Sequence, residues 1–239
     1  MSILYFLLIV LGVATFYLVA VSIVFRHEVK AVFDRDAAAT SFFEVLLTYS
    51  GLHALALYRM SNKFKKLKIP FFPRFISQFA KWITGIEIHP SAKIGNGLFI
   101  DHGMGVVIGE TSEIGNNVTI FQGVTLGGTG KERGKRHPSI GDNVVIGAGA
   151  KILGNINIGN NVQIGANAVV LRNVPDNSTV VGVPGRIAKF EGKKKPGINL
   201  DHTSLPDPLT QSLERLQGEI DHMEGEIKDY HQRKQEDKK

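Results

Sequence analysis

Aliphatic residues recur with a period of six through the middle of the chain, with a shift after Ile100 and a longer break after Leu126. They are Ile88, Ile94, Ile100, Ile108, Ile114, Ile120, Leu126, Ile140, Ile146, Ile152, Ile158, Ile164 and Val170. A period of six fits neither an α-helix nor the two-residue alternation of hairpin strands. It is typical of a parallel β-helix with three hexapeptides per triangular coil, whose coils stack about 4.8 Å apart. Gly, Asn and Asp often follow the aliphatic residue and suit corners that need positive φ. We therefore predict a mainly β fold, a parallel β-helix over residues 86–190.

The amino-terminal stretch has a different pattern, because residues 2–25 contain no charged side chain. As a helix they would extend about 36 Å, enough for a hydrocarbon core of about 30 Å. The basic start and the small-x-small cleavage site of a signal peptide are not evident. We therefore predict a transmembrane helix over residues 1–25. Arg26, Lys30 and Arg35 follow it, and the positive-inside rule then places the rest of the chain in the cytoplasm. The alternative is a wholly cytoplasmic protein in which this helix is buried.

Residues 26–85 show apolar positions at three- and four-residue spacings, which predicts helices that cap the first coil. A break is expected at Ser50-Gly51, and Pro70 and Pro73 break the next segment. Seven Lys or Arg residues and no acidic residue lie between Arg59 and Lys81. This basic stretch is either a solvated helical surface or an attraction for anionic lipid or a phosphorylated substrate.

The break after Leu126 contains "GGTGKERGKRHPS", with four glycines and five basic residues. Removing eight residues restores the six-residue phase, so we predict a loop that leaves one corner of the solenoid. Insertions of this kind often lie on a binding face.

The carboxy-terminal part begins with a predicted linker over residues 191–205. Apolar residues then alternate at steps of four and three, at Leu209, Leu213, Leu216, Ile220, Met223, Ile227 and Tyr230. This heptad pattern predicts a coiled-coil helix over residues 206–235. The alternative is a helix packed back on the solenoid.

The composition excludes some kinds of chemical site. A chain of 239 residues suits one or two domains, and without cysteine it has neither disulfides nor a Cys-ligated metal. A zinc site of the three-histidine kind needs its ligands around one ion. The solenoid histidines His89, His102 and His137 are isolated in the sequence, so we expect no metal. We also expect no nucleic-acid partner.

Two groups of residues carry candidate chemistry. Asp101 and His102 are consecutive beside a corner, and Glu87 precedes His102 by fifteen residues, close to one coil of eighteen. On adjacent coils this carboxylate would take the imidazole N–H and leave the other nitrogen as a base. Arg136 and His137, on the extruded loop, offer donors for a carboxylate.

Several motifs carry a resemblance to a known family. "VFDRDAAA", "GIEIHPSAKIGNGLFIDHGMGVVIGET", "TLGGTGK" and "KRHPSIGDNVVIGAGAKILGNI" resemble serine O-acetyltransferases, over roughly Val32 to Ile187. The resemblance is to the short bacterial form and implies a left-handed β-helix that assembles as a homotrimer. It also implies transfer of acetyl from acetyl-CoA to the L-serine hydroxyl, the first step of cysteine biosynthesis from serine.

The resemblance also implies roles for single residues. His102 would be the general base and Glu87 the acid that orients it. The serine ammonium would bind Asp36 and Asp101, and its carboxylate Arg136 and His137. Acetyl-CoA would contact backbone groups of Gly128, Ala148 and Ala166, with Lys131 near its phosphates.

Three positions depart from the family pattern. Ala37 replaces the proline of the family's "RDPA", and Glu87 stands where many relatives have Asp. Long-form relatives end in Ile, which docks into cysteine synthase, whereas this chain ends in Lys239. Cysteine synthase as a partner is therefore implied less directly than the substrates are.

A positioned imidazole contributes about 10²–10⁴-fold as a general base, so direct transfer in a ternary complex is expected. Two other functions stay open. One is an acetyltransferase of the hexapeptide class that acts on a sugar hydroxyl or amine, for which a carboxylate-binding Arg136 would have little purpose. The other is a non-enzymatic, membrane-tethered scaffold.

Overall fold

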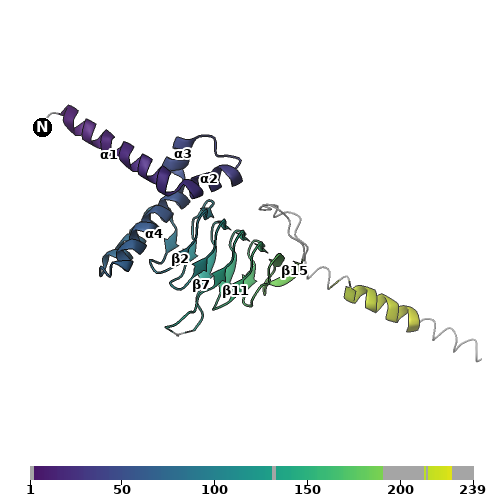
Figure 1. Ribbon diagram of the computed structural model, residues 1–239. Helices are drawn as coiled ribbons and strands as arrows, with labels where there is room; N and C mark the ends of the chain where they lie inside the picture. The colour runs from purple at the N-terminus through teal and green to yellow at the C-terminus, as the bar shows by residue number, and fades with distance from the viewer. Residues whose placement is uncertain (1–2, 131–132, 191–212, 214, 228–239) are drawn as a thin grey trace, which may run out of the picture.

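The computed structural model describes residues 3–130, 133–190, 213 and 215–227; the side chains of residues 14, 16–24, 189 and 190 are outside that description. Five helices precede the solenoid (Figure 1): α1 (Ile3–Val24), α2 (Arg26–Arg35), α3 (Phe42–Thr48), α4 (Ser50–Lys66) and α5 (Phe72–Thr84). The break predicted near Ser50-Gly51 falls at Tyr49, between α3 and α4, and both of those residues lie in the first turn of α4.

Three parallel sheets form the sides of a prism. Sheet A contains β1 (Glu87–Ile88), β4 (Val107–Ile108), β7 (Thr125–Gly127), β10 (Lys151–Leu153) and β13 (Val169–Val170). Sheet B contains β2 (Lys93–Ile94), β5 (Glu113–Ile114), β8 (Ser139–Ile140) and β11 (Asn157–Ile158). Sheet C contains β3 (Phe99–Ile100), β6 (Thr119–Ile120), β9 (Val145–Ile146), β12 (Gln163–Ile164), β14 (Ser178–Val181) and an antiparallel last strand, β15 (Arg186–Phe190).

The period-six prediction is confirmed at each of its thirteen positions. Each aliphatic residue named above lies in a strand of the prism, and all of them are buried. Burial of a side chain of this size stabilises the fold by about 1.5–3 kcal/mol relative to exposure. The stacked aliphatic columns therefore hold the coils together.

Each corner of the prism joins two sheets, so along one coil the chain passes an AB corner, a BC corner and a CA corner in turn. The BC corner carries a ladder in which backbone N–H groups donate to side-chain oxygens of the next coil. Its rungs join Asn96 to Asn116, Asn116 to Asp142, Asp142 to Asn160 and Asn160 to Asp176. The ladder satisfies backbone donors that the short strands leave free.

The extruded loop leaves the AB corner, as predicted. Glu113 pairs with Ser139, twenty-six positions later, whereas Ser139 pairs with Asn157, eighteen positions later. The first coil is also longer than eighteen residues, because Glu87 pairs with Val107. Two extra residues are accommodated at the CA corner between β3 and β4.

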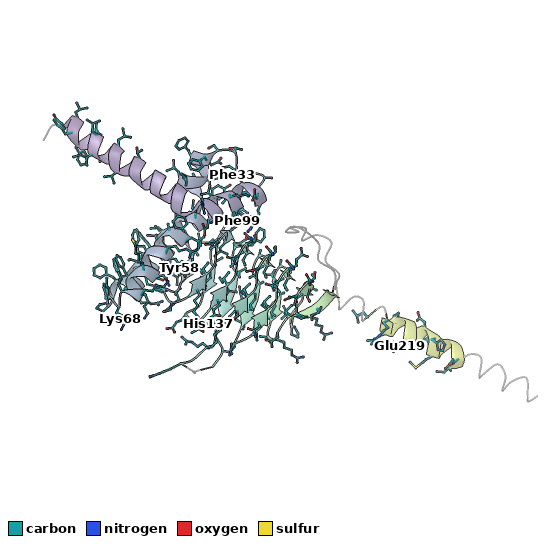
Figure 2. The ribbon with its side chains drawn as sticks, in the orientation of Figure 1. Phe33, Tyr58, Lys68, Phe99, His137 and Glu219 are labelled. Atoms are coloured by element: carbon teal, nitrogen blue, oxygen red, sulfur yellow. The ribbon has the colours of Figure 1, made fainter. Side chains whose placement is uncertain are left out.

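The helices α2, α4 and α5 cover the first coil. The Tyr58 hydroxyl of α4 donates to the Ala92 carbonyl at 2.6 Å, and Ser77 of α5 donates to Ile88 at 2.8 Å. Figure 2 shows Tyr58 at this junction. The Arg35 guanidinium reaches from α2 to the carbonyls of Gly97 and Val118, both at 3.2 Å. These bonds fix the helical cap on the prism.

The predicted membrane span receives no support from the structure. In the portion whose side chains are described, no helix combines the length and apolarity that crossing a bilayer requires. The first turns of α1 are nevertheless apolar and exposed, for example Ile3 at 80% and Leu11 at 64%.

The predicted carboxy-terminal helix is present at residues 215–227. Its heptad residues Leu216, Ile220, Met223 and Ile227 are exposed, as is Leu213. The rest of the predicted heptad, Leu209 and Tyr230, lies outside the described residues, as does the predicted linker over 191–205.

Candidate active site

The segment after β3 forms an enlarged CA corner that presents His102. His102 itself has φ +56°, and Gly103 and Gly105 have φ +75° and +76°. The Gly105 N–H donates to the Gly85 carbonyl at 2.9 Å, which ties this corner to the start of the solenoid. Its left-handed backbone turns the His102 side chain outward, where it is exposed.

The start of α4 lies directly against this corner. A Cβ at Gly51 would overlap the Ile100 carbonyl, so only glycine permits the observed approach. The adjacent Ser50 hydroxyl donates to the His102 carbonyl at 3.4 Å. Close packing of α4 therefore brings Tyr49 and Ser50 beside Asp101 and His102.

Asp36, predicted to bind an ammonium group, lies at the same corner. Its Oδ2 accepts a 2.6 Å hydrogen bond from the Tyr49 hydroxyl, and its Oδ1 accepts the Ala38 N–H at 2.8 Å. Burial, and then this hydrogen bond and the charge of Asp36, raise the pKa of Tyr49, with smaller contributions from the charges of Glu44 and Asp101. Tyr49 thus stays protonated at neutral pH and is held on Asp36, within range of the Asp101 charge. That the two aspartates together bind an ammonium group stays a prediction.

Glu87, the predicted partner of His102, makes a different contact. Its Oε2 accepts a 2.7 Å hydrogen bond from Lys81, and that contact together with the Lys81 charge lowers the pKa of Glu87. In register Glu87 faces Val107, five positions past His102, whereas a coil of eighteen residues would have put Gly105 opposite it. No hydrogen bond or ion pair links Glu87 and His102, both of which are described residues, so the orienting role stays a prediction.

The AB corner holds Arg136 and His137, which converge on Thr111 of the coil below. The Thr111 hydroxyl accepts the N–H groups of Arg136 (3.0 Å) and His137 (3.1 Å). The hydroxyl oxygen lies 2.9 Å from Nδ1 of His137, and the Thr111 N–H donates to the same nitrogen at 3.2 Å. Nδ1 is therefore an acceptor, and the neutral ring carries its proton on Nε2.

His137 is buried rather than displayed on the loop, with 8% of its surface exposed. Its ring lies on Gly109, where any Cβ would overlap it, and its Nε2 lies 3.2 Å from the Cβ position of Gly128. Burial, and then the neighbouring Arg136 charge, lower the pKa of His137. At neutral pH this residue is thus a fixed hydrogen-bond donor without charge.

Arg136 donates to Glu110 Oε2 at 2.5 Å, and this bond is the main cause of the lowered pKa of Glu110. His89 lies within range of the Glu110 charge, and its Nδ1 accepts the Ser91 N–H at 3.1 Å. Burial lowers the pKa of His89 to about 4. A cavity of about 290 Å³ opens beside this cluster and is lined in part by Ser91, Glu110, Thr111 and Lys135.

The predicted ligand groups are therefore divided between two corners, at opposite edges of sheet A. Asp36, Asp101 and His102 lie at the CA corner with Ala148 and Ala166, whereas Arg136, His137 and Gly128 lie at the AB corner. Lys131 lies outside the described residues. Figure 2 shows His137 at the base of the extruded loop, away from α2 and the start of α4, which Asp36 and Tyr49 adjoin. Among the described residues, no three His, Cys, Asp or Glu side chains gather as a metal-binding group.

Known proteins are similar to this chain in sequence and in fold. A family model described as bacterial transferase hexapeptide (six repeats) matches residues 137–172. A serine acetyltransferase of Staphylococcus epidermidis is 58% identical over 205 residues, which cover 85% of this chain and 96% of that protein. The serine acetyltransferase of Bacillus subtilis is 54% identical over 208 residues, which cover 87% of this chain and 95% of that protein. The chain belongs to the serine acetyltransferase family.

Solved structures agree with this assignment. The Vibrio cholerae serine acetyltransferase superposes with a TM-score of 0.73 at 41% identity, and covers 77% of this chain and 72% of its own. The Neisseria gonorrhoeae enzyme in complex with serine has a TM-score of 0.68 at 42% identity, and covers 72% of this chain and 70% of its own. The resemblance predicted from the motifs is confirmed.

Supporting residues of this family member were not evident in the sequence. Tyr49 lies in a break between two helices and carries no motif, and Thr111 and Glu110 follow an ordinary repeat residue. Their contacts to Asp36 and to Arg136 join segments more than ten residues apart. The one available signal was Gly51, a glycine at the start of a helix, which indicates close backbone approach.

Proposed function

We propose that this enzyme transfers the acetyl group of acetyl-CoA to the hydroxyl of L-serine and so forms O-acetylserine for cysteine biosynthesis. The observation that carries the proposal is the division of charge in the site. Asp36 and Asp101 offer carboxylates around Tyr49, and Arg136 with His137 offers donors. An amino acid carries both the ammonium and the carboxylate that such a pair of groups binds, whereas a neutral sugar carries neither and an amino sugar has no carboxylate.

His102 is the proposed general base. It takes the proton of the serine hydroxyl as the oxygen attacks the thioester carbonyl, and it returns that proton to the departing sulfur. Its outward position at a rigid, glycine-containing corner suits this role, because effectiveness depends on a fixed geometry. Glu87 is proposed to orient His102, which requires its carboxylate to move from Lys81.

The site is proposed to form between two copies in a homotrimer of left-handed prisms. The two groups of ligands lie on different corners of one prism, so one chain does not surround a small substrate. A neighbouring prism would bring its AB corner to the CA corner of the first. Gly128 from the former and Ala148 and Ala166 from the latter would then both line the acetyl-CoA path. The exposed heptad residues of the carboxy-terminal helix offer the same three chains a further apolar contact.

An assay of thiol release from acetyl-CoA tests the function. Activity is expected with serine and to be much lower with sugars, and homoserine measures how strictly the side-chain length is read. His102→Ala is expected to lower turnover by about 10²-fold or more, the usual scale for a lost general base. A His102→Ala enzyme within a few-fold of the unaltered protein would exclude the mechanism. Activity on a sugar but not on serine would exclude the substrate.

A location at the cell membrane is also proposed, with the catalytic part on the cytoplasmic side. It is supported by the uncharged residues 2–25, by the basic residues after them and by the exposed apolar side chains at the start of α1. Extraction tests it: the full-length protein should stay with membranes in alkaline carbonate. Recovery of the protein in the soluble fraction would leave the alternative, a cytoplasmic location.

A further inference from the structure

The outer face of α5 is an aromatic stripe with no partner in the described chain. Its members are Phe71, Phe72, Phe75, Phe79, Trp82 and Ile83, with exposed fractions of 74%, 55%, 54%, 44%, 81% and 49%. The opposite face of α5 supplies the buried residues Ile76, Ser77 and Ala80, which pack on the chain. The helix is thus apolar on two sides, although only one side packs against the fold.

Aromatic contacts join the stripe into two neighbouring groups of rings. Phe71 stacks on Phe75 with ring centroids 5.7 Å apart and meets Phe72 edge-on at 6.1 Å. Phe79 and Trp82 are 6.1 Å apart. Phe71 has φ +64°, a region that bulky side chains rarely adopt, yet its ring is held in solvent.

Basic side chains border the stripe. Lys63, Lys65, Lys66 and Lys68 lie at the end of α4 and in the turn to α5, and Figure 2 shows Lys68 at the far end of this hairpin. The sequence has no acidic residue between Glu44 and Glu87. Lys81 is paired with Glu87, but within the described residues Lys63, Lys66 and Lys68 form no ion pair. The surface is therefore apolar with an uncompensated positive border.

We propose that the α5 stripe and its lysine border bind the surface of an anionic bilayer. Phe and Trp side chains on one face of a helix, with Lys nearby, are the features of helices that lie in the plane of a membrane interface. Anionic headgroups supply negative charge that compensates the lysines, and the boundary between headgroups and acyl chains covers the aromatic rings.

Charge also argues against a second copy of the chain as the partner that covers the α5 stripe. A twofold contact of stripe on stripe would bring lysine borders together with no acidic residue of this region between them. In a head-to-tail contact the neighbour would have to offer free carboxylates. Glu87, Glu110 and Glu113 of the solenoid already hold Lys81, Arg136 and Lys93. The remaining acids of the solenoid are Asp142 and Asp176, which accept N–H groups of the BC-corner ladder, and Asp101, which belongs to the proposed serine site.

The chain has one tryptophan, Trp82, so its fluorescence reports on the stripe alone. The full-length protein is reconstituted in vesicles of phosphatidylcholine, with or without phosphatidylglycerol. In the anionic vesicles we expect a blue shift of Trp82 emission, quenching by brominated acyl chains and protection from acrylamide. Neutral vesicles are the control for α1, because they keep any contribution of that helix constant. In them the emission of Trp82 should stay close to that of a solvent-exposed tryptophan.

Two double variants separate the lysine border from net charge. Lys66→Gln with Lys68→Gln should abolish the blue shift, whereas Arg172→Gln with Arg186→Gln, an equal charge loss at exposed sites on the solenoid, should preserve it. Equal spectra in both kinds of vesicle would overturn the proposal. Trp82 already shielded from acrylamide without lipid, in an oligomer of measured mass, would also overturn it and assign the stripe to a second copy.

Discussion

The Tyr49 hydroxyl donates a 2.6 Å hydrogen bond to Oδ2 of Asp36, and so links the break before α4 to the end of α2. The other oxygen of Asp36 accepts the Ala38 N–H, so the carboxylate is held from both sides. This second bond closes the loop at Ala37, where the family pattern has proline. Asp36 is therefore oriented by its own turn and by Tyr49 before any substrate arrives.

Loss of the Tyr49 hydroxyl should weaken serine binding. A hydrogen bond to a charged group contributes about 1.5–3 kcal/mol, so Tyr49→Phe should raise KM for serine about tenfold or more. The effect on kcat should be smaller, because Tyr49 contacts Asp36 and not the reacting hydroxyl. Tyr58→Phe is the control, since its hydroxyl bonds a backbone carbonyl of the cap and should affect stability instead. An unchanged KM for serine in Tyr49→Phe would show that the orientation of Asp36 by Tyr49 does not contribute to serine binding.

Gly109 should be irreplaceable for a steric reason. A Cβ there would overlap the His137 ring, so Gly109→Ala should displace His137 from Thr111 and reduce kcat/KM by about tenfold or more. Gly134→Ala, on the extruded loop that carries His137, meets no atom within 4 Å and should leave activity unchanged. Similar activities of the two variants would show that the position of His137 does not matter.

His89 should make stability fall in mild acid. Its pKa is lowered to about 4, so the unfolded chain binds a proton at a higher pH than the folded protein does. The stabilising contribution is therefore complete above the unfolded pKa of about 6.5 and is lost as the pH falls toward 4. Melting temperatures between pH 8 and pH 5 should decline more for the unaltered protein than for His89→Gln. Parallel declines would contradict the assignment.

Complementation tests the shared site. His102→Ala and Arg136→Ala proteins, each inactive alone, are unfolded, mixed and refolded together. Mixed trimers should contain some sites with both residues intact and regain part of the activity, because the two residues lie on different corners of each prism. Mixed trimers of confirmed mass that stay as inactive as the single variants would place the site within one chain.

The sequence by itself determined the solenoid, because its signal is local and repeated. Each hexapeptide carries its own inward aliphatic residue, so strands, corners and the extruded loop follow from the period alone. Asp36, Asp101, His102, Arg136 and His137 were predicted as a group from motifs, and the family they indicate is confirmed by close relatives.

Only the tertiary structure decided how these residues are oriented. Glu87 and His102 were expected on adjacent coils, but two extra residues at one corner put Val107 opposite Glu87, which pairs with Lys81. His137 was expected on the extruded loop as a donor for a carboxylate, and the structure buries its ring on Gly109 and bonds it to Thr111. Such contacts depend on the length of each coil and on the approach of α4 at Gly51. Both depend on distant parts of the chain together, and no single repeat encodes them.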